Sequence, residues 1–152
     1  MALTIDDVRA EIDLDEINYP ATAERLGPEA LPLLQELADG SDPTLASKAV
    51  YLAGVISPDD AAPIVNQAAG HPDPVVRIAA AAGLSNLAEG DAENPLDRLL
   101  EDDDVGVRKA ALKSAAAFET QPMNARVQQV AEQDPEPLMR QLAEQSVPES
   151  SP

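Results

Sequence analysis

The side chains that usually carry catalysis or bind metals are scarce in this sequence. His71 is the only histidine and there is no cysteine, which excludes two-histidine metal sites, thiolate ligands and cysteine nucleophiles. The acidic run at residues 101–104 could hold a hard cation through its carboxylate oxygens, but it lacks the alternate spacing and the glycine of a calcium loop. A turn in which Asp104 caps the next helix explains the run more simply. The sequence therefore predicts a protein that is not an enzyme and that uses neither a metal nor a cofactor.

The composition is strongly acidic. Lys and Arg total 10 against 28 Asp and Glu, which gives a formal net charge of −18 among 152 residues. Such a surface repels nucleic-acid phosphate and anionic lipid, so no nucleic acid and no membrane is expected as a partner. The charge is typical of proteins from a salt-rich cytoplasm, but it could instead reflect a basic partner. The first ten residues lack the basic and apolar parts of a signal peptide, and we expect a cytoplasmic protein.

An acid followed by a helical pattern recurs about every 31 residues, at Asp42, Asp73, Asp104 and Glu136. Each acid is expected to cap the helix that it opens. Three residues after each acid stands an apolar residue, seven residues after it an alanine, and eleven residues after it another apolar residue. These offsets lie on one side of a 3.6-residue helix, so they predict a buried stripe.

An arginine stands four residues after three of these acids, at Arg77, Arg108 and Arg140, whereas the first copy has Ala46. A guanidinium one turn into a helix can pair with an acid in its own repeat or in the next one. We therefore predict that the four acids and the three arginines form a structural ladder along a stack of repeats.

A second helical segment with prolines near its start precedes each acid. These segments are predicted at residues 28–38, 58–69, 94–100 and 124–133. Ser57 before Pro58 is a helix-start signal, and the second prolines, Pro32 and Pro63, are expected to kink their helices. The repeating unit is therefore a pair of helices.

A helix pair of about 31 residues, with proline in its first helix and Asp…Val-Arg…Ala…Leu in its second, resembles the HEAT-repeat family, especially its short phycobilisome-lyase-like branch. The stretch that matches this motif best is residues 71–80, His-Pro-Asp-Pro-Val-Val-Arg-Ile-Ala-Ala. The resemblance implies an all-α, right-handed α-solenoid of about four helix pairs. It permits a bilin lyase or isomerase, but scarce aromatic residues and a single histidine leave little to grip a tetrapyrrole.

The two ends of the chain differ from the repeats. Residues 1–27 are predicted to form an N-terminal helical cap, in which Thr4 opens a capping box and Val8, Ile12 and Ile17 cover the end of the stack. The repeats are expected at residues 28–57, 58–89, 91–120 and 123–147. Residues 148–152 are polar and rich in proline, and they are predicted to be disordered.

A partner is expected on the side of the second helices that faces away from the buried stripe, because that side lines the concave surface in this fold. It has no carboxylate in its three central helices, although the chain is acidic. Tyr51 and Ile78 would be apolar anchors, and Lys109 and Lys113 would pair with an acid of the partner. Alternatively, the small residues of this side serve only curvature and packing. The predicted partner-binding residues are Ser47, Tyr51, Val75, Ile78, Lys109 and Lys113.

Two functions are compatible with these patterns. One is a non-catalytic adaptor or scaffold that binds a protein segment on its concave face, in a signalling, motility or assembly system. The other is an accessory of an enzyme or of a cofactor-handling, lyase-like system. In both cases the expected partner is another protein. The sequence does not determine the oligomeric state, and we expect a monomer.

Overall fold

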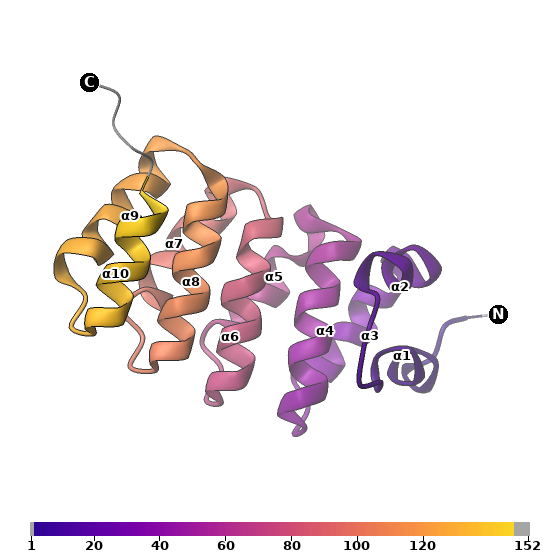
Figure 1. Cartoon of the computed structure of the whole chain (residues 1–152). Coiled ribbons are helices and arrows are strands. Elements are labelled where there is room, and N and C mark those ends of the chain that lie inside the picture. The colour runs from indigo at the N-terminus through magenta and orange to yellow at the C-terminus, as the bar shows by residue number, and fades with distance from the viewer. Residues whose placement is uncertain (1, 148–152) are drawn as a thin grey trace.

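The computed structural model describes residues 2–147, and all regular elements among them are helices (Figure 1). The predicted all-α fold is therefore confirmed, and the predicted disordered tail lies outside the described residues. Short 3-10 helices, η1 (Pro28–Ala30) and η2 (Leu84–Asn86), precede α3 and follow α6. The α-helices are α1 (Ile5–Ile12), α2 (Tyr19–Leu26), α3 (Leu31–Ala38), α4 (Pro43–Ile56), α5 (Pro58–Ala68), α6 (Pro74–Gly83), α7 (Glu89–Leu99), α8 (Val105–Phe118), α9 (Gln121–Gln133) and α10 (Pro137–Ser146).

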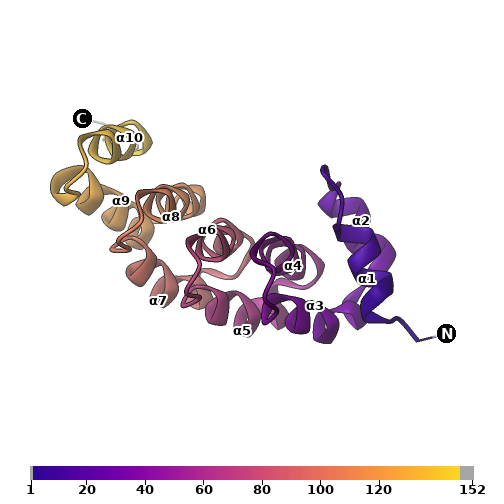
Figure 2. The same cartoon turned by 90° about the horizontal axis from the view of Figure 1, so that it is seen from below.

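Four helix pairs stack side by side into an α-solenoid. The first helices of the pairs, α3, α5, α7 and α9, form one layer, and the second helices, α4, α6, α8 and α10, form the other (Figure 2). The stack is curved, and the second helices lie on the inside of the curve, so they line its concave face. At the N-terminal end of the stack, α1 and α2 lie on this same concave side. The predicted solenoid of about four helix pairs with an N-terminal helical cap is confirmed.

The core lies between the two layers and consists of small aliphatic side chains. The alanines seven residues after each acid, Ala49, Ala80, Ala111 and Ala143, are fully buried. Alanine at these positions lets the packed helices approach closely. The apolar residues three positions after each acid, such as Val76 and Val107, are buried as well. The buried stripe of each second helix therefore faces the first helices, and the opposite side is left for the concave surface.

The N-terminal cap begins with the expected capping box. The Thr4 hydroxyl accepts a hydrogen bond from the N–H of Asp7 at 3.2 Å, and the Asp7 carboxylate accepts one from the N–H of Thr4 at 2.9 Å. The hydrogen bond from the Thr4 N–H, together with the Thr4 hydroxyl beside the carboxylate, holds the pKa of the Asp7 carboxyl below its ordinary value. Val8 and Ile12 are fully buried in the core, and Ile17 packs against it. The cap thus covers apolar surface at the end of the stack.

Two helix starts differ from the sequence-based expectation. α7 begins at Glu89 and α9 at Gln121, several residues before the predicted starts at 94 and 124. Pro95 lies inside α7, where it removes one backbone hydrogen bond. The burial of Leu96 and Leu99 against the core keeps this segment helical in spite of that loss.

The start signals around the prolines also act differently from the prediction. Ser57 is the N-cap residue of α5, but its hydroxyl donates to the Asp60 carboxylate at 2.9 Å and does not accept a backbone hydrogen bond. Pro32 lies in the first turn of α3, after η1, so it begins a helix and does not kink one. Pro63 lies within α5.

Candidate functional site

Carboxylates cap three of the four second helices. The Oδ1 atoms of Asp42, Asp73 and Asp104 accept hydrogen bonds from first-turn N–H groups of α4, α6 and α8 at 2.8–3.2 Å. Glu136 occupies the same position at α10 but makes no such bond. Its own N–H donates to Asp134 Oδ1 at 2.9 Å. The capping role predicted from the sequence is therefore wrong for Glu136.

Two arginines link successive turns of the solenoid. Arg77 on α6 donates to both carboxylate oxygens of Asp102 at 2.9 and 3.1 Å. Arg108 on α8 donates to both oxygens of Asp134 at 3.1 and 3.5 Å. Their partners, Asp102 and Asp134, stand two residues before Asp104 and Glu136, and they are not among the acids predicted for the ladder. Arg140 donates to the backbone carbonyl of Asp134 at 2.7 Å.

The corresponding ion pair is absent in the first repeat, and both of its members are replaced. Ala46 stands where the arginine would be, and His71 stands where the carboxylate would be. His71 Nδ1 instead accepts a hydrogen bond from the N–H of Asp73 at 2.9 Å. Asp102 Oδ1 accepts the equivalent bond from Asp104 at 2.9 Å. The only histidine of the sequence thus lies in the turn between α5 and α6 and accepts a hydrogen bond there.

Burial shields these two ion pairs from water and so strengthens the attraction between their charges. The side chains of Arg108 and Asp134 are only 11% and 3% exposed. For Asp102, burial raises the pKa of its carboxyl, but hydrogen bonds from Arg77 and from the N–H of Asp104, together with the charges of Arg77 and Arg108, outweigh burial and lower the pKa below its ordinary value. Asp102 therefore stays ionised beside the arginines.

A second set of polar contacts joins the first helices on the outer layer. Gln35 on α3 donates to Gln67 on α5 at 3.1 Å, and Arg98 on α7 donates to Asn66 on α5 at 2.8 Å. The two contacts are equivalent in the repeat: Gln35 and Asn66 each stand seven residues before a capping acid, and Gln67 and Arg98 each stand six residues before the capping acid of the following repeat. These contacts were not predicted from the sequence, where only the prolines and bounds of the first helices were considered.

The pattern changes between α7 and α9, where the repeat period lengthens from 31 to 32 residues. Val130 now occupies the position that held Gln67 and Arg98. Arg126, one turn earlier, supplies the polar contact instead and donates to both oxygens of Asp97 at 2.6 and 3.2 Å. This hydrogen-bonded carboxylate raises the pKa of the Arg126 guanidinium.

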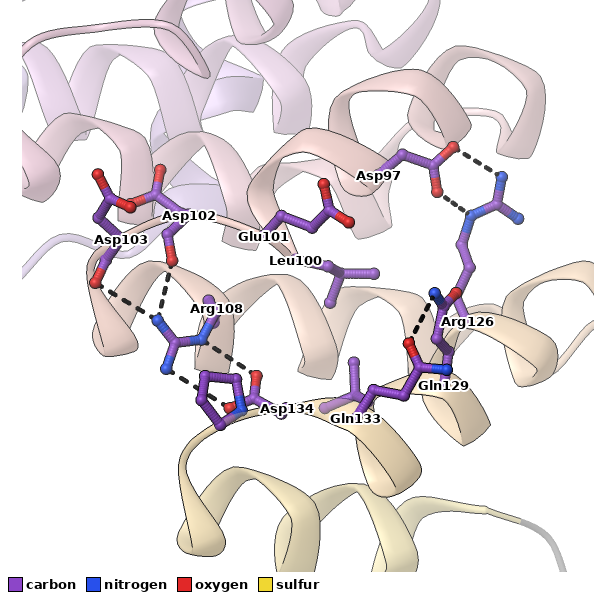
Figure 3. A pocket seen from close by; sticks show the side chains of 12 residues that line it. Asp97, Leu100, Glu101, Asp102, Asp103, Arg108, Arg126, Gln129, Gln133 and Asp134 are labelled. Carbon is purple, nitrogen blue, oxygen red and sulfur yellow. Dashed lines mark hydrogen bonds and ion pairs between the residues drawn. The ribbon is translucent and has the colours of Figure 1, made fainter.

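A groove of about 620 Å³ opens between α7 and α9 at this point (Figure 3). The Arg108–Asp134 pair borders one end and the Arg126–Asp97 pair the other, with Leu100, Gln129 and Gln133 between them. Val130 also lines the groove. All three nitrogens of each guanidinium already donate to a carboxylate or a backbone carbonyl. The groove therefore offers hydrogen-bond acceptors, and it has no free cation for an anionic ligand.

The concave face differs in charge from the rest of the molecule. The four second helices carry six of the ten Lys and Arg residues and a single carboxylate, Glu144. The other acids of the chain stand in the first helices, the cap, the turns and the tail. A molecule with a net charge of −18 thus presents a surface on α4, α6 and α8 that has no negative side chain.

The predicted partner-binding residues fall on successive turns of this surface. Val75 on α6 is 49% exposed, and Ile78, one turn further, is partly buried against the core. Lys109 and Lys113 on α8 are exposed and lie one turn apart. Neither lysine forms an ion pair with any residue from 2 to 147. Their predicted role in binding stays a prediction.

Two of the predicted residues already have partners within the chain. The rings of Tyr51 on α4 and Tyr19 on α2 meet edge to face, with centroids 4.8 Å apart. Burial and the neighbouring Tyr51 raise the pKa of Tyr19. The hydroxyl of Ser47 donates to the backbone carbonyls of Pro43 at 2.7 Å and Val75 at 3.2 Å. The cap thus covers the face over α4, and the open part of the concave surface lies over α6, α8 and α10.

The part of the chain that the structure describes has neither a metal-binding cluster nor a membrane-spanning helix. Residues 2–147 contain no group of three or more His, Cys, Asp or Glu side chains placed to hold a metal ion. No helix in that range is long and apolar enough to cross a membrane.

The repeat architecture is matched by a known protein family. A family model described as HEAT repeats matches residues 30–92 and 62–147. The chain belongs to the HEAT-repeat family. The family predicted from the motif and the period is therefore confirmed. No curated protein matches the chain.

A solved structure of similar fold belongs to a complex of two proteins. The chain is similar to a protein in the complex of CpcE and CpcF of phycocyanin lyase from Nostoc sp. PCC7120, with a TM-score of 0.71 and 21% sequence identity. The match covers 93% of this chain and 96% of that one. At this identity the likeness establishes the fold, and it agrees with the predicted resemblance to the short phycobilisome-lyase-like branch.

Proposed function

We propose that this chain is a non-catalytic scaffold that binds another protein on its concave face. The observation that carries the proposal is the charge of that face, since an overwhelmingly acidic chain keeps carboxylates away from the exposed side of α4, α6 and α8. Lys109 and Lys113 have no ion pair among residues 2–147. An acidic group of a partner could form an ion pair with each of these two lysines.

The partner belongs, in this proposal, to an enzyme-accessory system. The similar solved structure is a complex of two proteins of a phycocyanin lyase, which supports a subunit-like role of this kind more directly than a role in signalling or motility. The chain would then hold or position an enzyme or its protein substrate, while the chemistry takes place on the partner. A general adaptor for a signalling, motility or assembly system is the second candidate, and the same concave surface supports it.

Affinity capture from the native cell extract at matched high salt tests the proposal. The wild type is compared with Lys109→Glu/Lys113→Glu and with Arg9→Glu, a control that reverses one exposed charge on α1. We expect a protein that is captured by the wild type and the control but lost from the lysine variant, and mass spectrometry then shows whether it is an enzyme component. Equal capture by all three chains would place the interaction elsewhere on the molecule.

A further inference from the structure

A row of exposed apolar side chains runs along the concave face. Val75, Val105 and Leu138 stand in the first turns of α6, α8 and α10 and are 49%, 48% and 56% exposed. Among residues 2–147, Leu14 in the turn between α1 and α2 is the only other large apolar side chain of such exposure. Val75 and Leu138 stand two residues after the acids of their repeats, and Val105 stands one residue after Asp104. Three such residues in the first turns of three successive second helices form a stripe, which is more than scattered surface apolarity provides.

The stripe lies beside the unpaired lysines. Val105, Lys109 and Lys113 stand four residues apart on α8, so they follow one another along the same side of that helix. The apolar row is therefore flanked by positive charge in the next two turns. A carboxylate-bearing segment is favoured there over a basic one, because the flank contains lysines and no acid.

The distance between neighbouring second helices determines the residue spacing that a bound segment needs in order to contact all three apolar side chains. Packed helices are about 8–10 Å apart, and α6 and α8 are close, since a Cβ on Gly106 would lie 3.2 Å from Ile78 Cδ1. An α-helix advances about 10.5 Å in seven residues and returns nearly to the same side. A helix that crosses the second helices can therefore place residues i, i+7 and i+14 on Val75, Val105 and Leu138.

Extended segments fit this face less well. A β-strand advances a similar distance in three residues, but residues i and i+3 of a strand point to opposite sides. An extended segment also leaves backbone N–H and C=O groups that need partners. The exposed side of α6 and α8 provides apolar side chains such as Ile78 and the amines of two lysines, and no amide. On α10 only Gln141 and Gln145 carry amides. A helix satisfies its own backbone groups and needs no such partners.

We propose that the partner binds through an amphipathic helix that lies along this stripe, with apolar residues at heptad spacing and carboxylates opposite Lys109 and Lys113. The proposal rests on the proposed function and specifies the kind of segment that is bound. One end of the stripe is bounded by the cap, because α2 packs on α4 through Tyr19 and Tyr51. The bound helix therefore extends from α6 towards α10.

Fluorescence anisotropy with three labelled synthetic peptides of equal length, net charge and leucine content tests this proposal. The first is helical with leucines at i, i+7 and i+14 and glutamates on one flank. The second is helical with the leucines at i, i+5 and i+10, and the third is proline-rich and extended with a leucine at every third position. We expect the heptad peptide to bind about tenfold more tightly than the other two.

Variants of the protein then locate the binding surface. Val105→Ser and Lys109→Glu/Lys113→Glu are expected to weaken the heptad peptide about tenfold each, whereas Leu14→Ser, matched in exposure, leaves its affinity unchanged. Equal binding of the two helical peptides, tighter binding of the extended peptide, or equal loss in Leu14→Ser would overturn the proposal. Loss of the cellular partner from the lysine variant without a heptad preference would overturn this inference alone and leave the proposed function standing.

Discussion

The relative stability of two arginine–aspartate pairs tests how this solenoid is held together. Arg108–Asp134 and Arg126–Asp97 are both bidentate ion pairs, and the distance from the guanidinium Nε to the carboxylate oxygen is shorter for Arg126, 2.6 Å against 3.1 Å. They differ in burial, because Asp134 is 3% exposed and Asp97 is 53% exposed. If distance decided, Arg126 would contribute more to the stability of the fold; if burial decides, Arg108 contributes more.

We predict that burial decides. Replacing Arg108 by Met leaves the Asp134 carboxylate buried with one backbone N–H donor, from Glu136, and this is expected to cost about 3 kcal/mol. Replacing Arg126 by Met frees an exposed carboxylate that water can solvate, at a cost of about 0.5 kcal/mol. The change at Arg108 corresponds to a folding equilibrium constant lower by roughly 150-fold.

Urea unfolding followed by far-ultraviolet circular dichroism measures both costs under one salt condition. The double variant Arg108→Met/Asp134→Asn is a further check, because it removes the buried charge that Arg108→Met leaves behind. We expect it to be more stable than the single Arg108 variant. A cost for Arg126→Met equal to or above that for Arg108→Met would refute the reasoning.

Three further predictions follow from the same structure. The pKa of Asp102 is lower in the folded chain than in the unfolded chain, so the stability that this carboxylate contributes is present above about pH 5 and is lost as the pH falls below about 4 and through the lowered pKa. Asp102→Asn should therefore flatten the slope of the unfolding free energy against pH in that window. An unchanged slope in urea titrations would contradict this assignment. Ser114 on α8 is buried, and its hydroxyl donates to the Ala81 carbonyl on α6, so Ser114→Ala should lower the unfolding free energy by about 1 kcal/mol. The control is Ser85→Ala, which should cost less because the exposed Ser85 hydroxyl bonds only within its own segment. With a net charge of −18, the thermal midpoint should rise steeply from dilute buffer to molar salt because salt screens self-repulsion, and a midpoint independent of salt would argue against a high-salt habitat.

The second helices could be predicted from the sequence because one register controls their start, their buried side and their exposed side. The acids at Asp42, Asp73 and Asp104 recur at equal spacing, and each cap and each buried alanine follows from counting forward. The charge difference of the concave face could be read in the same way, since the exposed positions of the second helices follow from the buried ones.

The first helices and the ladder were harder to predict. Pro95 resembles a helix start, but burial of its neighbours places it inside α7. Asp102 stands in the acidic run 101–104, and Asp134 has Glu132 and Glu136 nearby, so several carboxylates compete for each arginine. Only the folded turn shows which one points at the guanidinium. The available signal was the recurrence of an aspartate two residues before Asp104 and two residues before Glu136.

The contact between Tyr19 and Tyr51 had no signal in the repeat. Tyr19 belongs to the cap, which has no periodic relation to the second helices, so its packing on α4 depends on tertiary structure alone. This contact is why the binding experiments rely on Val105, Lys109 and Lys113: a change at Tyr51 would alter the cap and the concave face together.

Photo-crosslinking from a single cysteine tests the central claim, partner binding on the concave face, most directly. The chain has no cysteine, so Val105→Cys and Leu14→Cys each carry one benzophenone label, at sites that are 48% and 49% exposed in the parent chain. In native extract at matched salt, we predict one defined crosslinked protein from position 105 and none from position 14. The same crosslink from both positions, or from position 14 alone, would contradict binding on the concave face.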